Sequence, residues 1–229
     1  MKLHQYEFYL FDIDRTLFDF ETNAKASMKM CLADFDVPVG DYEKFWADYQ
    51  VINKHYWNLY ESGKIDKDTL RSQRIYQAIK QILGIDDQGF SNRLEAGYLW
   101  HMGEMNGMMP HAKEVVVELK RRGKRLGIVS NGFHEVQYRK LRTCGIREYF
   151  DVVAISDEIG VVKPAPGIFG YAMNVLGGTK GNTIMVGDDP EVDIEGAQVF
   201  GIDQYYYNPG HVPCDCAPTY EGDDLRDLL

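Results

Sequence analysis

The 229-residue sequence contains no apolar run near the roughly 20 residues that a helix needs to span a bilayer. Its first residues, MKLHQYEF, lack the apolar core of a signal peptide. These two absences predict a cytoplasmic protein with no membrane partner. The sequence also lacks repeats and Pro/Gly/Ser-rich linkers, so we expect one large domain or one domain that carries an insertion.

Positive charge is scarce, because 25 Lys and Arg residues stand against 35 Asp and Glu residues and give a formal net charge of −10. A nucleic acid polymer binds to clustered Lys and Arg, so the sequence predicts no such partner. A small anionic ligand can still bind in a local pocket. Hydrophobic residues make up 45% of the chain, which is enough for a buried core.

Cysteine is also scarce, with four residues in the chain. Cys31 and Cys144 lie in apolar helical patterns, which predicts buried thiols. Cys214 and Cys216 are two apart and follow His211. A zinc site usually needs a second pair of ligands elsewhere, and the sequence offers none. We therefore interpret this pair as incidental cysteines of the C-terminal segment.

Short apolar runs alternate with helical patterns in most of the chain. The expected strands are 6–13, 125–131, 151–156, 182–188 and 202–208, with an edge strand near Pro218–Tyr220. The expected helices between the later strands are 111–123, 134–145 and 167–177. Alternation of this kind, with nearly continuous apolar strands, predicts an α/β fold with a doubly wound, Rossmann-like parallel sheet.

The stretch after the first expected strand breaks this alternation. Apolar residues recur there at intervals of three and four, which predicts helices at 22–35, 41–61, 66–83 and 87–102. We therefore expect an all-helical cap domain at 19–107, inserted into a catalytic core formed by 1–18 and 108–229. Doubly wound sheets bind ligands at the carboxyl ends of their strands, where this insertion begins.

Polar residues follow several of the expected strands at this same edge. Asp12 and Asp14 end the first apolar run, where like charges should repel each other. The other polar residues at this edge are Ser130, Asn131, Gly132, Lys163, Asp188, Asp189 and Asp193. Such a set suits Mg²⁺ and a phosphate, because the ion binds carboxylates while lysine, hydroxyl and backbone N–H groups bind phosphate oxygens.

The order of these residues resembles the four motifs of the haloacid dehalogenase-like hydrolase superfamily. The matching stretches are DIDRT at 12–16, the serine at 130, KP at 163–164 and GDD with a later aspartate at 187–193. The resemblance covers almost the whole chain. It points to the phosphatase branch, since dehalogenases of the superfamily generally lack the second aspartate.

The resemblance also implies roles for these residues. Asp12 is then the nucleophile that forms an aspartyl-phosphate, and Asp14 is the general acid and base. Mg²⁺ would be held by Asp12, Asp188 and the backbone carbonyl of Asp14, with Asp189 as a ligand or an outer partner. Lys163, Ser130, Asn131 and Gly132 would bind the phosphoryl group. Asp193 would orient the metal's surroundings.

Residues next to the DIDRT stretch raise further expectations. Arg15 departs from the small or acidic residue usual at its place, and we expect its side chain to point away from the metal. Thr16 either bonds the turn backbone or acts indirectly. Phe18 and Phe20 are candidates to face the substrate.

The helical insertion indicates a substrate class through a second resemblance. The stretch YQVINKHYWNLYESGKID at 49–66 resembles the cap of bacterial pyrimidine 5′-nucleotidases. The residues that carry the likeness are Tyr49, Asn53, Trp57, Tyr60 and Gly63. The sequence thus predicts a Mg²⁺-dependent phosphatase for a small phosphate monoester, here a nucleoside 5′-monophosphate, working as a monomer or homodimer.

Three alternatives stay open at this point. The same core serves phosphatases or mutases that act on a sugar phosphate or on phosphoglycolate. A phospho-aspartate signalling module also uses a Mg²⁺-bound aspartate, but it needs neither Asp14 as an acid nor an inserted cap. A catalytically inactive scaffold would be expected to lose a motif residue, and this chain loses none.

Overall fold

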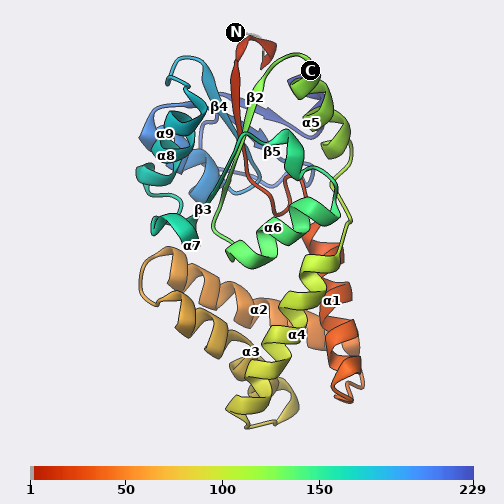
Figure 1. The fold of residues 1–229 in the computed structure, drawn as a ribbon. Coiled ribbons are helices and arrows are strands. Elements are labelled where there is room, and N and C mark those ends of the chain that lie inside the picture. Colours follow the sequence, from red (N-terminus) through yellow and green to blue (C-terminus); the bar gives the residue numbers. More distant parts are fainter. Residues whose placement is uncertain (1–2) are drawn as a thin grey trace. The chain divides into compact units, whose positions relative to one another are not determined.

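The computed structural model describes residues 3–229, and the chain divides into two compact units. One unit contains the chain up to Phe20 together with Asn106–Leu229, and the other contains Glu21–Met105. Figure 1 colours the ribbon along the sequence, so the first unit holds both ends of the colour scale. The chain thus leaves the first unit after its first strand and returns to it.

The described part of the first unit contains a sheet of six strands in the order β3-β2-β1-β4-β5-β6. Every neighbouring pair is parallel. The strands are β1 (Phe8–Phe11), β2 (Arg125–Ser130), β3 (Val152–Ile155), β4 (Thr183–Gly187), β5 (Asp203–Tyr207) and β6 (Tyr220–Gly222). The predicted parallel α/β fold is confirmed, including the edge strand near Tyr220.

Helices cover both faces of this sheet. Figure 1 shows α8 and α9 on one side and α5 and α6 on the other. The bounds are α5 (Ala112–Arg121), α6 (His134–Thr143), α7 (Ser156–Ile159), α8 (Pro166–Leu176) and α9 (Gly196–Phe200). A π-helical turn, Pro190–Glu195, precedes α9. Short 3-10 turns occupy Leu3–Gln5, Arg147–Tyr149 and Leu225–Leu228.

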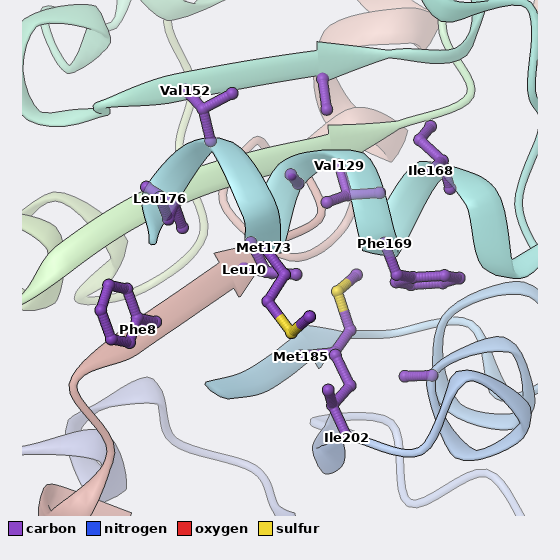
Figure 2. Packing of buried hydrophobic residues seen from close by; sticks show 13 residues of the cluster. Phe8, Leu10, Val129, Val152, Ile168, Phe169, Met173, Leu176, Met185 and Ile202 are labelled. Carbon is purple, nitrogen blue, oxygen red and sulfur yellow. The ribbon is translucent and has the colours of Figure 1, made fainter. Parts of the chain in front are cut away.

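One hydrophobic cluster of this unit lies between α8 and the sheet. Figure 2 shows Phe169 and Met173 of α8 among buried side chains from the central strands, such as Leu10 and Met185. All of these side chains are less than one-tenth exposed. Burial of one such side chain stabilises the fold by roughly 1.5–3 kcal/mol. This packing holds α8 against the strands whose ends carry the polar residues.

The second unit is helical, with α1 (Phe20–Asp34) leading into it, followed by α2 (Tyr42–Glu61), α3 (Lys67–Leu83) and α4 (Gln88–Glu104). The helices α2, α3 and α4 each begin after an aspartate whose side chain accepts a backbone N–H, which satisfies a donor left over at the helix start. The described residues contain no helix long and apolar enough to cross a membrane.

Aromatic and ionic contacts hold the helical unit together. Tyr49 is 1% exposed and packs against Trp46 and Tyr98. Arg74 and Glu95 form a buried ion pair at 2.6 Å. Tyr49 is therefore a core residue of this unit. Trp57 and Tyr60, which carry the likeness to nucleotidases together with it, are partly exposed.

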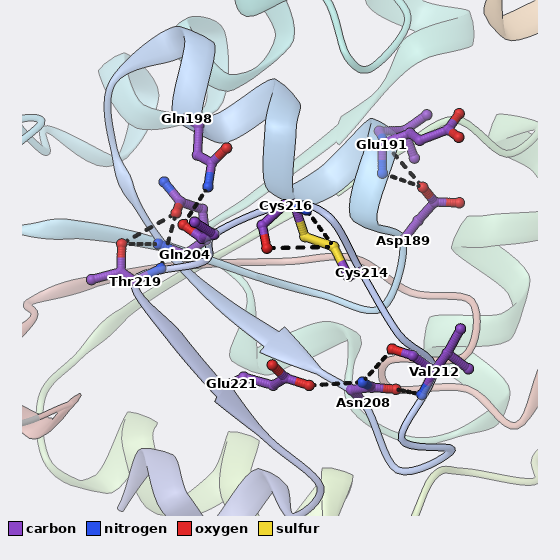
Figure 3. The surroundings of a disulfide bond; sticks show 12 residues. Asp189, Glu191, Gln198, Gln204, Asn208, Val212, Cys214, Cys216, Thr219 and Glu221 are labelled. Atoms are coloured by element: carbon purple, nitrogen blue, oxygen red, sulfur yellow. Dashed lines mark hydrogen bonds between the residues drawn. A yellow bond between two sulfur atoms is a disulfide. The ribbon is translucent and has the colours of Figure 1, made fainter.

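The cysteines fulfil one expectation and correct another. Cys31 and Cys144 are buried free thiols, as predicted. Cys214 and Cys216 were expected to be incidental, and this interpretation is wrong because they form a disulfide. Figure 3 shows the bond in the segment between β5 and β6. Its Cα atoms are 5.2 Å apart, within the range that a disulfide spans.

Candidate active site

The carboxyl ends of the central strands bring the predicted motif residues together in the first unit. Phe11 of β1 is in register with Ile128 of β2 and Val186 of β4. The chain just past each strand therefore reaches the same edge. Asp12 extends this ladder, since its N–H donates to the Val186 carbonyl at 2.9 Å. Asp188 follows β4 at the same level.

Lys163 lies between two carboxylates in the loop before α8. Its Nζ donates to Asp12 Oδ1 at 2.6 Å and to Asp193 Oδ1 at 2.7 Å. The lysine side chain is 2% exposed. Burial by itself lowers the pKa of Lys163, but the two carboxylates raise it above its ordinary range. The ammonium is therefore a fixed positive charge at this edge.

A reciprocal pair of hydrogen bonds holds the backbone at Lys163. The Asn131 side chain accepts from the Lys163 N–H at 2.7 Å and donates to the Lys163 carbonyl at 3.1 Å. Asn131 directly follows β2, so this contact ties the lysine loop to the central sheet. The side chain of Asn131, predicted to bind substrate, is engaged in positioning Lys163.

Three carboxylates lie close together at this edge, and two of them, Asp12 and Asp193, are bonded to Lys163. Oxygens of Asp12, Asp188 and Asp193 all lie within 4.8 Å of one another. Burial raises the pKa of Asp12, against the effect of Lys163. Burial also raises the pKa of Asp188 well above its ordinary range, and the other two carboxylates add to the rise. In the same way, burial raises the pKa of Asp193 to about 7, although Lys163 opposes it.

This donor set fits a hard divalent cation. The single ammonium of Lys163 offsets the charge of one carboxylate out of three, so the ionised group would carry excess negative charge. Mg²⁺ prefers oxygen ligands and is bound by one or two carboxylates in many phosphate sites. The residues present therefore suit the ion that the sequence predicts.

Asp189 is engaged differently from its neighbour Asp188. Its Oδ1 accepts the N–H groups of Glu191 and Val192 and caps the π-helical turn, as Figure 3 shows for Glu191. Its own N–H donates to Asp193 Oδ2 at 3.2 Å. Among the described residues, the set of three close carboxylates therefore includes Asp193 and does not include Asp189.

Gly187 allows Asp193 to approach the end of β4. A Cβ atom at this position would lie 2.4 Å from Asp193 Oδ2. We expect Gly187→Ala to displace that carboxylate and to lower the free energy of unfolding by about 1–3 kcal/mol, measured by chemical denaturation. Gly181→Ala is the matched control, because a Cβ there meets nothing within 4 Å. Equal stability of the two variants would contradict this close approach.

The side chain of Asp14 is bound by two residues that sequence reasoning missed. Its Oδ1 accepts from Lys140 Nζ at 2.6 Å, and its Oδ2 accepts from Gln137 Nε2 at 2.9 Å. Gln137 Nε2 also donates to Ser130 Oγ at 2.8 Å. Both residues lie on α6, which was predicted only as a covering helix. The sequence signal that could have revealed them is the spacing of Gln137 and Lys140, two polar residues three apart in the helix that follows Ser130.

The DIDRT turn places its remaining side chains around this edge. The hydroxyl of Thr16 lies 3.3 Å from Asp188 Oδ1 and donates to it. The Arg15 guanidinium lies 4.6 Å from the centre of the Phe20 ring, and its charge opposes the raised pKa of Asp188. Phe18 is 1% exposed and its ring contacts Lys140, so it packs inward.

Comparison with known proteins identifies the family to which the chain belongs. The pattern of haloacid dehalogenase-like hydrolases matches residues 6–201. The chain belongs to the haloacid dehalogenase-like hydrolase family. The resemblance seen in the four motifs is thereby confirmed, and the protein is a hydrolase by family.

Relatives within this family cover nearly the whole chain. The pyrimidine 5′-nucleotidase YjjG of Escherichia coli is 30% identical, over 98% of this chain and 96% of YjjG. The pyrimidine 5′-nucleotidase PynA of Streptococcus pneumoniae is 29% identical, over 98% of this chain and 94% of PynA. The solved structure of YfnB from Bacillus subtilis, bound to magnesium, matches with a TM-score of 0.89 at 28% identity, covering 98% and 97% of the two chains.

Proposed function

We propose that this hydrolase is a Mg²⁺-dependent phosphatase that acts on nucleoside 5′-monophosphates and prefers pyrimidine nucleotides. The observation that carries the proposal is the buried Asp12 carboxylate, which is paired with Lys163 and lies close to Asp188. The names of YjjG and PynA support the substrate class. The helical unit, inserted after β1, would then supply the preference for the base.

Mg²⁺ would be held by Asp12, Asp188 and the backbone carbonyl of Asp14, with Asp189 and Asp193 as outer partners. Bound there, the ion would supply counter-charge for the carboxylates and for the phosphate. Thr16 would orient Asp188 through its hydroxyl, which donates to Oδ1 of that carboxylate. A phosphate monoester carries about 1.5 to 2 negative charges at neutral pH, so this counter-charge is needed for it to bind beside Asp12.

Asp12 would act through Oδ2, because Lys163 engages Oδ1. In the first step this oxygen attacks phosphorus while the bond to the leaving oxygen breaks. Asp14 gives that leaving oxygen a proton, and an alcohol departs. In the second step Asp14 takes a proton from water, whose oxygen displaces Asp12 from phosphorus. Inorganic phosphate leaves, and both aspartates return to their starting forms.

The phosphoryl group would be bound at the end of β2. Ser130 Oγ accepts hydrogen bonds from Gln137 Nε2 at 2.8 Å and from the Gly132 N–H at 3.2 Å. With both of these donors aimed at its oxygen, the hydroxyl hydrogen of Ser130 is directed toward a third group. A phosphoryl oxygen is the acceptor that the proposal places there. Lys163 and the backbone around Asn131 would stabilise the charge that spreads over the transferring group.

Phosphate release from a panel of esters tests this proposal. The panel contains UMP, dUMP, TMP, AMP, phosphoglycolate and several sugar phosphates, each with Mg²⁺ and with EDTA. We expect release from the pyrimidine nucleotides to be fastest, to fall with EDTA and to recover when excess Mg²⁺ is added. Faster release from a sugar phosphate or phosphoglycolate would overturn the substrate class. Absence of release from every ester would overturn the phosphatase proposal itself.

A further inference from the structure

Helix α6 presents two buried polar side chains to Asp14. Gln137 is 1% exposed and Lys140 is 3% exposed. Together they donate to both carboxylate oxygens of Asp14, at 2.9 Å from Gln137 and 2.6 Å from Lys140. Because each oxygen has its own donor, rotation of the carboxylate about its last bond breaks two hydrogen bonds. One helix therefore fixes the orientation of this group.

The ammonium of Lys140 is itself held by two aromatic rings. Its Nζ lies 4.6 Å from the centre of the Phe18 ring and 5.4 Å from that of Phe20. Cations are attracted to the faces of such rings, and this attraction is stronger away from water. A buried ion pair generally adds little stability compared with apolar side chains of the same volume. Stability alone is therefore a weak reason for a lysine at this position.

Gln137 connects Asp14 to the end of β2. The same Nε2 donates to Asp14 Oδ2 and to Ser130 Oγ. Its amide lies directly on the backbone of Gly132, where a Cβ atom would be 2.2 Å from Nε2. The glutamine thus packs in space that any residue other than glycine at 132 would fill. This close contact fixes the amide between the two groups that it joins.

We propose that Gln137 and Lys140 are positioning residues for the reaction. They hold the carboxyl group of Asp14 in the orientation that delivers its proton to the leaving oxygen, and Lys140 stabilises the carboxylate that this transfer leaves until water returns the proton. Gln137 joins the same group to Ser130. This inference rests on the proposed phosphatase activity. It assigns a catalytic contribution to α6, which touches the reacting atoms only through Asp14 and Ser130.

If Gln137 and Lys140 position Asp14 as an acid, the effect of replacing them should depend on how strongly the leaving group needs a proton. An alkoxide that leaves from a nucleotide is strongly basic and needs a proton, whereas p-nitrophenolate leaves readily without one. Loss of an oriented general acid costs about 10²- to 10⁴-fold where the proton is needed. Disordering Asp14 should therefore slow the hydrolysis of an alkyl phosphate much more than that of p-nitrophenyl phosphate. A purely structural role would slow both esters alike.

The experiment compares kcat and KM for UMP and p-nitrophenyl phosphate in the full chain. The variants are Gln137→Met and Lys140→Met, which keep side-chain length, and Lys140→Arg, which keeps the positive charge. Lys120→Met is the matched control, because Lys120 also pairs with an aspartate, Asp151, at 2.6 Å. Asp151 precedes β3, so this control pair lies at the opposite edge of the sheet from Asp14.

We expect each Met variant to lose about 100-fold in kcat for UMP and less than about 5-fold for p-nitrophenyl phosphate. Lys140→Arg should recover most of the UMP rate, and Lys120→Met should match the parent chain on both esters. Near-UV circular dichroism verifies that each variant is folded. If Lys140→Met does not fold, the two single variants Lys140→Arg and Gln137→Met are sufficient for the test. Equal losses on both esters, or no loss on UMP, would overturn the inference while the phosphatase proposal stands. A parent chain inactive on UMP, on p-nitrophenyl phosphate and on every other ester of the panel would overturn the phosphatase proposal and the inference with it.

Discussion

Asp12→Asn should lower phosphate release by on the order of 10⁴- to 10⁶-fold, as removal of a nucleophile does in other enzymes that form covalent intermediates. The asparagine amide has the same shape, and its oxygen can still accept a hydrogen bond from Lys163. It cannot form an aspartyl-phosphate, however. The expected loss is therefore one of chemistry in a protein that remains folded, and kcat for the preferred ester of the panel measures it.

Two additional measurements make this result decisive. Asp66→Asn serves as the matched control, because Asp66 caps α3 and asparagine caps a helix equally well. After an acid quench during turnover with ³²P-labelled ester, the parent chain should carry protein-bound phosphate and the Asp12→Asn chain should carry none. Retention of full Mg²⁺-dependent activity by Asp12→Asn would contradict the proposed mechanism.

Lys163→Met should affect both stability and activity. The ammonium of Lys163 is the shared partner of Asp12 and Asp193, and all three side chains are less than one-tenth exposed. Removal of one member from a buried charged cluster typically costs about 3–5 kcal/mol, because it leaves buried charge uncompensated. The same change removes a cation from beside the transferring phosphoryl group, which is expected to lower kcat by about 10²- to 10³-fold.

Chemical denaturation of the full chain, without and with Mg²⁺, measures the stability change. Lys120→Met is again the control, because its partly exposed pair with Asp151 should contribute less than about 1 kcal/mol. Adding Asp193→Asn to Lys163→Met should restore part of the lost stability, since one of the two uncompensated carboxylates is then removed. A loss no larger than that of the control would show that Lys163 is dispensable to the fold.

The sequence pattern was sufficient to place the residues that follow the strands. Asp12, Ser130 and Asp188 come directly at or after strand ends, and the register of a parallel sheet carries all such ends to one edge. Lys163 was assigned to the same edge because it lies in a loop between two of the expected strands. These assignments need only the strand positions and the direction of each strand, which apolar runs reveal.

The partners of these residues could not be obtained in the same way. Gln137 and Lys140 lie on a helix whose apolar spacing explains only how it covers the sheet, and their contact with Asp14 spans more than 120 positions of the chain. Asp189 and Asp193 are chemically identical in the sequence. The backbone turn after Gly187 decides which of them caps the turn and which meets Lys163.

The reciprocal amide contact between Asn131 and Lys163 has a consequence for how the protein meets its substrate. Asn131 ties the lysine backbone to the strand that also carries Ser130, and Asp12 and Asp193 hold the ammonium, so folding places the ammonium and the hydroxyl at one edge of the sheet. In water, dipoles must turn toward a new charge at a cost in free energy. Here that reorganisation was completed during folding, so an arriving dianion would meet a field already aligned with it.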